Sequence, residues 1–182
     1  MTTPADVGRP FTVEDLEAMP DDGCRYELVD GAMLVSPAPG WAHQEALGRL
    51  YILLRMACPA NLCVILAPFS VRQDQFNEVQ PDLLVARLGD MTEKYLPRPP
   101  VLAIEIISPT SRLGDASLKK AFYARLGVRS YWLVDPVKPA LTAFELRGTD
   151  YAEIAYVAGD EGWQATEPFA VAITPAELIR GV

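Results

Sequence analysis

Histidine and paired cysteines are scarce in this sequence, and their scarcity excludes several kinds of site. His43 is the only histidine, so a histidine-rich zinc site is excluded. Cys24, Cys58 and Cys63 are an odd number of cysteines without a CxxC pair, which makes any usual zinc site or disulfide framework improbable and fits a reducing cytoplasm. A Ser-His-Asp hydrolase would need His43 as its base, and no GxSxG motif supplies a nucleophile.

Long apolar runs and a secretion signal are also missing. The longest uncharged apolar runs, such as residues 62–69, are far shorter than the about 20 residues of a membrane-spanning helix. The first ten residues lack the basic-then-apolar pattern of a signal peptide. We therefore expect a cytoplasmic protein without membrane contact. The length and the ordinary balance of hydrophobic and charged residues predict a single domain over residues 1–182.

Basic residues are fewer than acidic residues in this sequence. The 16 basic residues are outnumbered by 24 acidic ones, and the net charge of −8 argues against a protein that coats nucleic acid through bulk positive charge. Residues 98–129 are the exception, because they contain more basic than acidic residues. They form a candidate surface for a polyanion, with charges scattered over the solvated surface as the equally weighted alternative. Their basic residues are Arg98, Arg112, Lys119, Lys120, Arg125 and Arg129, and their acidic residues are Glu105 and Asp115.

The pattern of turns and apolar residues predicts helices that interrupt a set of strands. A short helix capped by Thr12 precedes a hairpin whose strands flank the turn Asp30-Gly31. The strands are expected at about 25–29, 32–36, 62–67, 69–73, 79–86, 100–107, 130–135, 140–146, 151–157 and 163–166, and the further helices at about 41–58, at 115–126 and from Thr174. We predict an α/β (α+β) fold with a central mixed β-sheet flanked by helices.

Two acidic residues lie where a buried core is expected. Glu105 is in the middle of residues 101–107, which are apolar on both alternating faces, as in a strand buried on both sides. Asp82 begins another apolar strand directly after Pro81. An isolated buried carboxylate is very costly, so each must be paired, bind a metal or become protonated.

A third acid and one lysine complete the set. Glu27 is flanked by apolar residues, although on an edge strand it would simply be exposed. On the wheel of the helix at 115–126, Lys119 lies on the apolar stripe with Phe122 and Tyr123, whereas Lys120 points about 100° away, toward solvent. The simplest arrangement places Lys119 against Asp82 and Glu105.

These groups suit metal-assisted hydrolysis of a phosphodiester. Mg²⁺ prefers carboxylate oxygens and water, and a bound metal lowers the pKa of water and polarises a phosphoryl oxygen. The lysine would hold or activate the attacking water and offset developing negative charge. A buried salt-bridge cluster without chemistry stays open as the alternative at this point.

The ordered motifs resemble the Uma-type family of predicted restriction endonucleases, in the PD-(D/E)XK nuclease superfamily. The matching segments run from about residue 11 to residue 136: Arg25-Tyr26-Glu27-Leu28-Val29-Asp30-Gly31, Ser36-Pro37, His43-Gln44, Pro81-Asp82, Ile104-Glu105-Ile106-Ile107-Ser108-Pro109, Asp115-x3-Lys119-x3-Tyr123 and Gly127-Val128-x2-Tyr131-Trp132-Leu133-Val134-Asp135-Pro136. Each is weak alone, but the ordered set is fairly specific. The superfamily pattern places a lysine at the position of Ile107, so the resemblance implies that Lys119 has migrated to the following helix.

The resemblance implies a restriction-endonuclease-like fold and Mg²⁺- or Mn²⁺-dependent cleavage of DNA. Asp82 and Glu105 would be metal ligands, with the backbone carbonyl of Ile106 as a further ligand. Lys119 would be the catalytic lysine, and Glu27 the additional acid for a second metal or an ordered water. A homodimer that acts on both strands is the arrangement we expect.

Three further residues are accessory candidates, and a second function stays open. His43 and Gln44 begin the long helix; His43 would contact a phosphate or tune the third acid, or would simply be packed in the core. Tyr123 would hydrogen-bond a site carboxylate or phosphate, with core packing equally compatible. The alternative function is a catalytically silent nucleic-acid-binding or assembly module that retains the nuclease fold.

Overall fold

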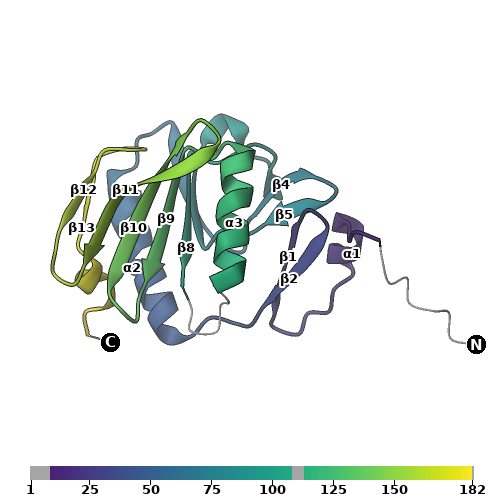
Figure 1. Cartoon of the computed structure of the whole chain (residues 1–182), viewed down its shortest axis with the longest axis horizontal. Coiled ribbons are helices and arrows are strands. Elements are labelled where there is room, and N and C mark those ends of the chain that lie inside the picture. The colour runs from purple at the N-terminus through teal and green to yellow at the C-terminus, as the bar shows by residue number, and fades with distance from the viewer. Residues whose placement is uncertain (1–8, 108–112, 182) are drawn as a thin grey trace, which may run out of the picture.

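The computed structural model describes residues 9–107 and 113–181, which form a mixed α+β architecture (Figure 1). The motif residues Ser108 and Pro109 and the basic residue Arg112 lie outside the described residues, as do the side chains of residues 113–116. No helix in the described ranges is both long and apolar enough to cross a membrane.

The helices and strands alternate irregularly along the chain. The helices are α1 (Val13–Glu17), α2 (Trp41–Ala57), α3 (Leu113–Leu126), and the 3-10 helices η1 (Leu88–Asp90) and η2 (Pro175–Ile179). The strands are β1 (Arg25–Val29), β2 (Ala32–Ser36), β3 (Leu62–Leu66), β4 (Ser70–Asp74), β5 (Asn77–Val79), β6 (Leu83–Arg87), β7 (Tyr95–Leu96), β8 (Leu102–Ile106), β9 (Ser130–Asp135), β10 (Ala140–Arg147), β11 (Asp150–Ala158), β12 (Trp163–Ala165) and β13 (Val171–Ile173).

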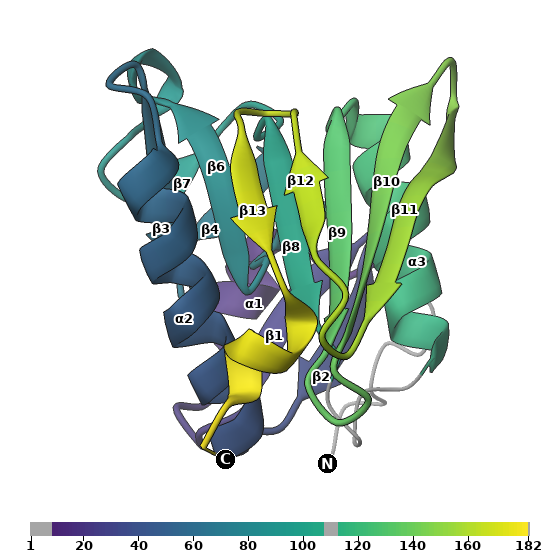
Figure 2. The ribbon, with the colours of Figure 1, turned by 90° about the vertical axis from the view of Figure 1, so that its left-hand side faces the viewer.

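A six-stranded sheet lies at the centre, in the order β11-β10-β9-β8-β6-β3. It is mixed, because β8 and β9 are parallel while the other neighbours are antiparallel. One face packs against α2 and the small β12-β13 sheet, which stand in front of it in Figure 2. The other face packs against α3 and residues of a second, five-stranded sheet.

The alternation of side chains along β8 decides where Glu105 points. Leu102, Ile104 and Ile106 join the core beneath α2, whereas Ala103 faces the core beneath α3. Because successive side chains in a strand point to opposite faces, Glu105 lies on the α3 face with Ala103. All five residues of β8 are buried, so the Glu105 side chain is buried on the α3 face of the sheet.

The second sheet, in the order β2-β1-β5-β4-β7, corrects one expectation and decides one alternative that the sequence left open. The sequence predicted one central sheet, with a single strand over 79–86. That segment is instead divided between β5 in the five-stranded sheet and β6 in the six-stranded sheet, with residues 80–82 between them. Glu27 is also not on an edge strand, because β1 is paired on both sides, with β2 and with β5.

The other element predictions were close. The hairpin around Asp30-Gly31 has the predicted bounds, with Asp30 and Gly31 both at positive φ. Thr12 caps α1 in a reciprocal pair with Asp15. The sequence missed β7 and β13, which are only two and three residues long, and the expected C-terminal helix is the 3-10 helix η2.

Candidate active site

Lys119 lies between two buried carboxylates that come from different sheets. Its Nζ is 2.8 Å from Glu105 Oε1 on β8 and 2.9 Å from Glu27 Oε1 on β1. The lysine is brought there by α3, whose inner face buries Phe122 and Tyr123 and thereby turns Lys119 toward the sheets. The backbone N–H of Gln80 also donates to Glu27 Oε1 at 2.7 Å. Lys119 therefore holds together α3 and both sheets.

Asp82 has a different set of partners, which corrects the predicted pairing with Lys119. Its Oδ1 accepts a hydrogen bond from Arg25 Nη1 at 2.8 Å. Its Oδ2 lies 3.1 Å from His43 Nε2 and accepts from the backbone N–H of Ile106 at 2.8 Å. The predicted contact of Lys119 with Glu105 is confirmed, but the contact with Asp82 was wrong. Arg25 on β1 and His43 on α2 contact Asp82, and Lys119 contacts Glu27 instead.

The carboxylates have opposite electrostatic environments. Burial raises the pKa of Asp82, but His43, Arg25 and the Ile106 N–H outweigh burial and hold the pKa below its usual range. Burial also raises the pKa of Glu105, to about 7; Lys119 opposes this rise, while Asp82 and Glu27 add to it. Asp82 is thus a stable anion, whereas Glu105 is an acid whose charged form the interior disfavours.

Lys119 remains a cation at neutral pH. Burial lowers its pKa, but Glu105 and Glu27 outweigh that effect and hold the pKa above the usual value. A lysine in this state donates hydrogen bonds and stabilises negative charge, and it cannot accept a proton as a general base. Lys119 can therefore act through its positive charge and its hydrogen bonds, and not through proton abstraction.

The accessory candidates separate into two groups. The hydroxyl of Tyr123 donates to Glu105 Oε1 at 2.8 Å, so its predicted contact with a site carboxylate is confirmed. His43 is buried and contacts Asp82 rather than the third acid, Glu27. Gln44, one residue further along α2, is exposed and lines the pocket beside His43. Within the described ranges, no hydrogen bond joins Gln44 to Glu27, Asp82 or Glu105.

Arg25 is the residue that the sequence reasoning missed. It lies two residues before Glu27 on β1, so both side chains point to the same face of the sheet. That alternation was a usable signal, because a strand that carries a buried acid toward a cluster carries its i−2 neighbour the same way. The arginine side chain is 22% exposed, so it lies at the border between the cluster and solvent.

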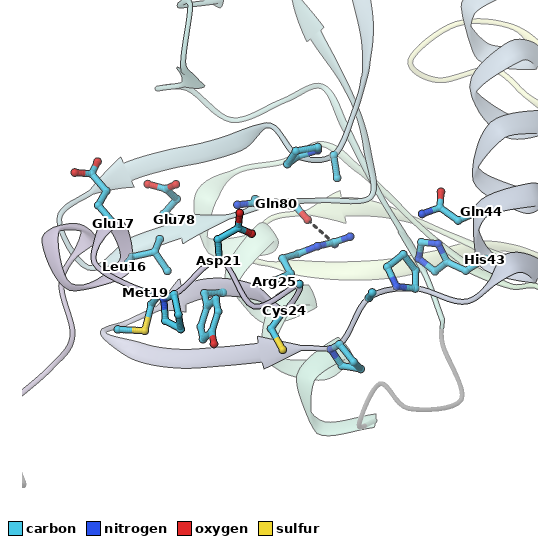
Figure 3. Close-up of a pocket in the computed structure, with 18 of the residues that line it drawn as sticks. Leu16, Glu17, Met19, Asp21, Cys24, Arg25, His43, Gln44, Glu78 and Gln80 are labelled. Carbon is cyan, nitrogen blue, oxygen red and sulfur yellow. Dashed lines mark hydrogen bonds between the residues drawn. The ribbon is translucent and has the colours of Figure 1, made fainter.

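A pocket of about 670 Å³ opens beside Arg25 and His43 (Figure 3). In Figure 3 the side chain of Arg25 extends toward His43 and Gln44, while Glu17 and Glu78 lie at the far end. Most of the wall consists of proline and apolar residues. Its other polar residues are Gln44 and Gln80 and three acids, Glu17, Asp21 and Glu78. The pocket therefore gives solvent a route to the arginine that contacts Asp82.

The basic zone at 98–129 does not act as one positive surface. Arg125 pairs with Asp30, and Arg98 with Asp90. Lys119 is buried between its two acids, and Lys120 stacks its ammonium on the ring of Phe144 rather than pointing freely to solvent. The described members of the zone agree with the interpretation of dispersed, locally paired charge.

Comparison with known proteins identifies a matching family and a solved structure with a similar fold. The family model Uma2, described as "Putative restriction endonuclease", matches residues 13–177. Among the solved structures, the chain is similar to "a putative nuclease belonging to DUF820" from Anabaena variabilis ATCC 29413. The TM-score is 0.75 at 16% sequence identity, over 93% of this chain and 98% of that one. No curated protein has a sequence that matches this chain.

Proposed function

Because the chain belongs to the Uma2 family, whose description is "Putative restriction endonuclease", we propose that it is a divalent-metal-dependent endonuclease that hydrolyses phosphodiester bonds in DNA. The observation that carries the proposal is the buried cluster in which Glu27, Asp82 and Glu105 meet Lys119 and Arg25. Burying Glu27, Asp82, Glu105 and Lys119 together carries a large desolvation cost.

The donor chemistry of the cluster fits a hard divalent cation such as Mg²⁺ or Mn²⁺. Carboxylate oxygens are the ligands that such cations prefer, and the raised pKa of Glu105 marks a charge that a cation would stabilise. Within residues 9–107 and 113–181, no three His, Cys, Asp or Glu side chains are gathered closely enough to hold a metal. The acids face Arg25 and Lys119 instead, so loading requires a local rearrangement.

In the proposed mechanism each residue has a separate task. Asp82 and Glu105 would hold the metal, with the carbonyl of Ile106 as a further ligand, and Glu27 would hold a second metal or an ordered water. A metal bound there would supply a Lewis acid and would lower the pKa of a coordinated water. Lys119 donates to the attacking water and stabilises the charge that develops on the phosphoryl oxygens during in-line attack.

The second candidate function is a silent nucleic-acid-binding or assembly module with the same fold. One observation favours it: each acid already has a cation or N–H partner, so the cluster is closed without a metal. A closed network of this kind is sufficient to fix how α3 and the two sheets pack, without any catalysis. The two candidates differ in whether divalent cations bind at Asp82.

Two measurements separate the candidates. Calorimetric titration with Mn²⁺ should show binding to the wild type that Asp82→Ala removes; equal heats in both would eliminate the metal site. Nicking of supercoiled and single-stranded DNA should be lost in Lys119→Ala and kept in Lys120→Ala, the adjacent lysine that stacks on Phe144. Equal nicking by the wild type and Lys119→Ala would assign the cleavage to other residues or to a contaminant.

The proposal extends to a cytoplasmic homodimer of single-domain subunits. A two-fold dimer would present one site to each DNA strand, and the three free cysteines are compatible with a reducing compartment. Sedimentation equilibrium of the full chain, with and without duplex DNA, tests the subunit number.

A further inference from the structure

The two oxygens of Asp82 differ in how fully they are occupied. Oδ2 is shared between His43 Nε2 and the backbone N–H of Ile106, which fills its two lone pairs. Oδ1 receives Arg25 Nη1. Oδ1 is therefore the oxygen that a metal would use, and a guanidinium nitrogen lies 2.8 Å from it.

The net charge of the cluster favours binding of a cation, and the net charge with that cation bound favours binding of an anion. Glu27, Asp82 and Glu105 bring three negative charges when ionised, and Arg25 and Lys119 bring two positive ones. The balance of these five side chains is one negative charge. A divalent cation changes it to one positive charge, which a phosphodiester then neutralises.

The two cations are not equally free to move. Lys119 is held between Glu27 and Glu105, with 8% of its side chain exposed. Arg25 is 22% exposed and forms part of the pocket wall, with a second hydrogen bond from Nη1 to the carbonyl of Gln80 at 3.2 Å. Arg25 can therefore leave Asp82 without entering the core, and its planar guanidinium suits a phosphate.

We propose that Arg25 is an exchangeable partner of Asp82: it occupies Oδ1 in the metal-free chain, yields that oxygen to a divalent cation, and then binds the phosphodiester from the pocket. This inference rests on the proposed nuclease function and assigns a residue to substrate binding. A permanent structural salt bridge is the opposing interpretation. When Arg25 is replaced, exchange predicts tighter metal binding, whereas a permanent salt bridge predicts metal affinity that is unchanged or weaker.

The first test is Mn²⁺ titration of the full-length chain and its Arg25→Gln variant. Exchange predicts that the variant binds Mn²⁺ more tightly, on the order of tenfold, because a charge-assisted hydrogen bond no longer competes for Oδ1. Affinity that is unchanged or weaker would overturn the exchange. Arg125→Gln is the matched control, because it removes the same charge from an exposed pair with Asp30 and should leave Mn²⁺ affinity within about twofold.

The second test concerns the substrate. At saturating Mn²⁺, Arg25→Gln should bind a short DNA duplex at least about tenfold more weakly than the wild type, because a charged phosphate contact is lost. Equal DNA affinity would overturn the phosphate role. Tighter metal binding with weaker DNA binding is a combination that a merely structural role does not produce.

A wild-type measurement keeps the inference testable if Arg25→Gln fails to fold. In protein labelled with ¹⁵N-arginine, the Arg25 side-chain signal, identified by its loss in Arg25→Lys, should shift when Mg²⁺ is added. A signal that stays unchanged while Mg²⁺ binds would refute the exchange and leave the nuclease proposal intact. Absence of any Mg²⁺ or Mn²⁺ binding would instead refute the nuclease proposal itself.

Discussion

Lys119 Nζ lies 2.9 Å from Glu27 Oε1, although the lysine belongs to α3 and the acid to β1 in the second sheet. The same ammonium is 2.8 Å from Glu105 in the six-stranded sheet. A single cation thus forms ion pairs with carboxylates from both sheets, on the face that α3 covers. Removing it leaves two buried acids with no cation between them, each with one neutral hydrogen-bond donor, the Gln80 N–H for Glu27 and the Tyr123 hydroxyl for Glu105.

Lys119→Met should destabilise the metal-free protein strongly. Breaking a buried ion pair from one side typically costs about 3–5 kcal/mol, because the remaining charge is left uncompensated. Chemical denaturation monitored by tryptophan fluorescence measures the change. Lys120→Met, which loses a stacking contact with Phe144, is the control and should cost at most about 1 kcal/mol. Similar losses in the two variants would contradict the assigned geometry.

Two tyrosines of the same core give a matched pair. Tyr123 donates to Glu105 at 2.8 Å, whereas the buried hydroxyl of Tyr131 has no hydrogen-bond partner within the described ranges. Tyr123→Phe should cost about 1.5–3 kcal/mol, since it removes a hydrogen bond to a charged group. Tyr131→Phe should be neutral or stabilising. Thermal unfolding of both variants tests the ranking, and the reverse order would count against it.

The raised pKa of Glu105 predicts a pH dependence of stability. Between the usual value of 4.5 and the folded value of about 7, the native state holds more of the Glu105 proton than the unfolded chain does. The free energy of unfolding should therefore fall as pH rises through this window, by up to about 1.4 kcal/mol per pH unit from this group.

Glu105→Gln provides the comparison for that slope. The variant lacks the titrating group, so its stability relative to the wild type should improve as pH rises through the window. Urea denaturation of both proteins at several pH values, in the presence of a chelator, gives the two slopes. Parallel slopes would show that Glu105 does not titrate there.

Asp82→Asn should abolish stabilisation by Mg²⁺. A ligand that binds only the native state at 100 times its dissociation constant adds about 2.7 kcal/mol to the free energy of unfolding. The wild type should gain this stability at saturating Mg²⁺, and the variant should not. Asp90→Asn, which alters an acid paired with Arg98 at the surface, should keep the full gain. Differential scanning calorimetry with and without the metal measures all three.

Much of the site could be found from local patterns. The apolar alternation around Glu105 predicted a strand buried on both faces, and the helical wheel placed Lys119 on the buried stripe; both side chains are buried. These predictions succeed because strand and helix periods fix which side of an element a residue faces. They left open whether the strand of Glu27 is an edge strand, because no local pattern reveals β5, the strand that pairs with β1 beyond the hairpin.

The sequence by itself determined that acids and a lysine enter the core, because period and neighbours decide whether a side chain faces inward. Only the tertiary structure decided which cation meets which acid. Arg25, His43 and Asp82 come from β1, α2 and the start of β6, and their contacts depend on how those elements pack over long separations in the chain. Distances of a few ångströms set ion pairing, and they follow from the packing of whole sheets rather than from any local run of residues.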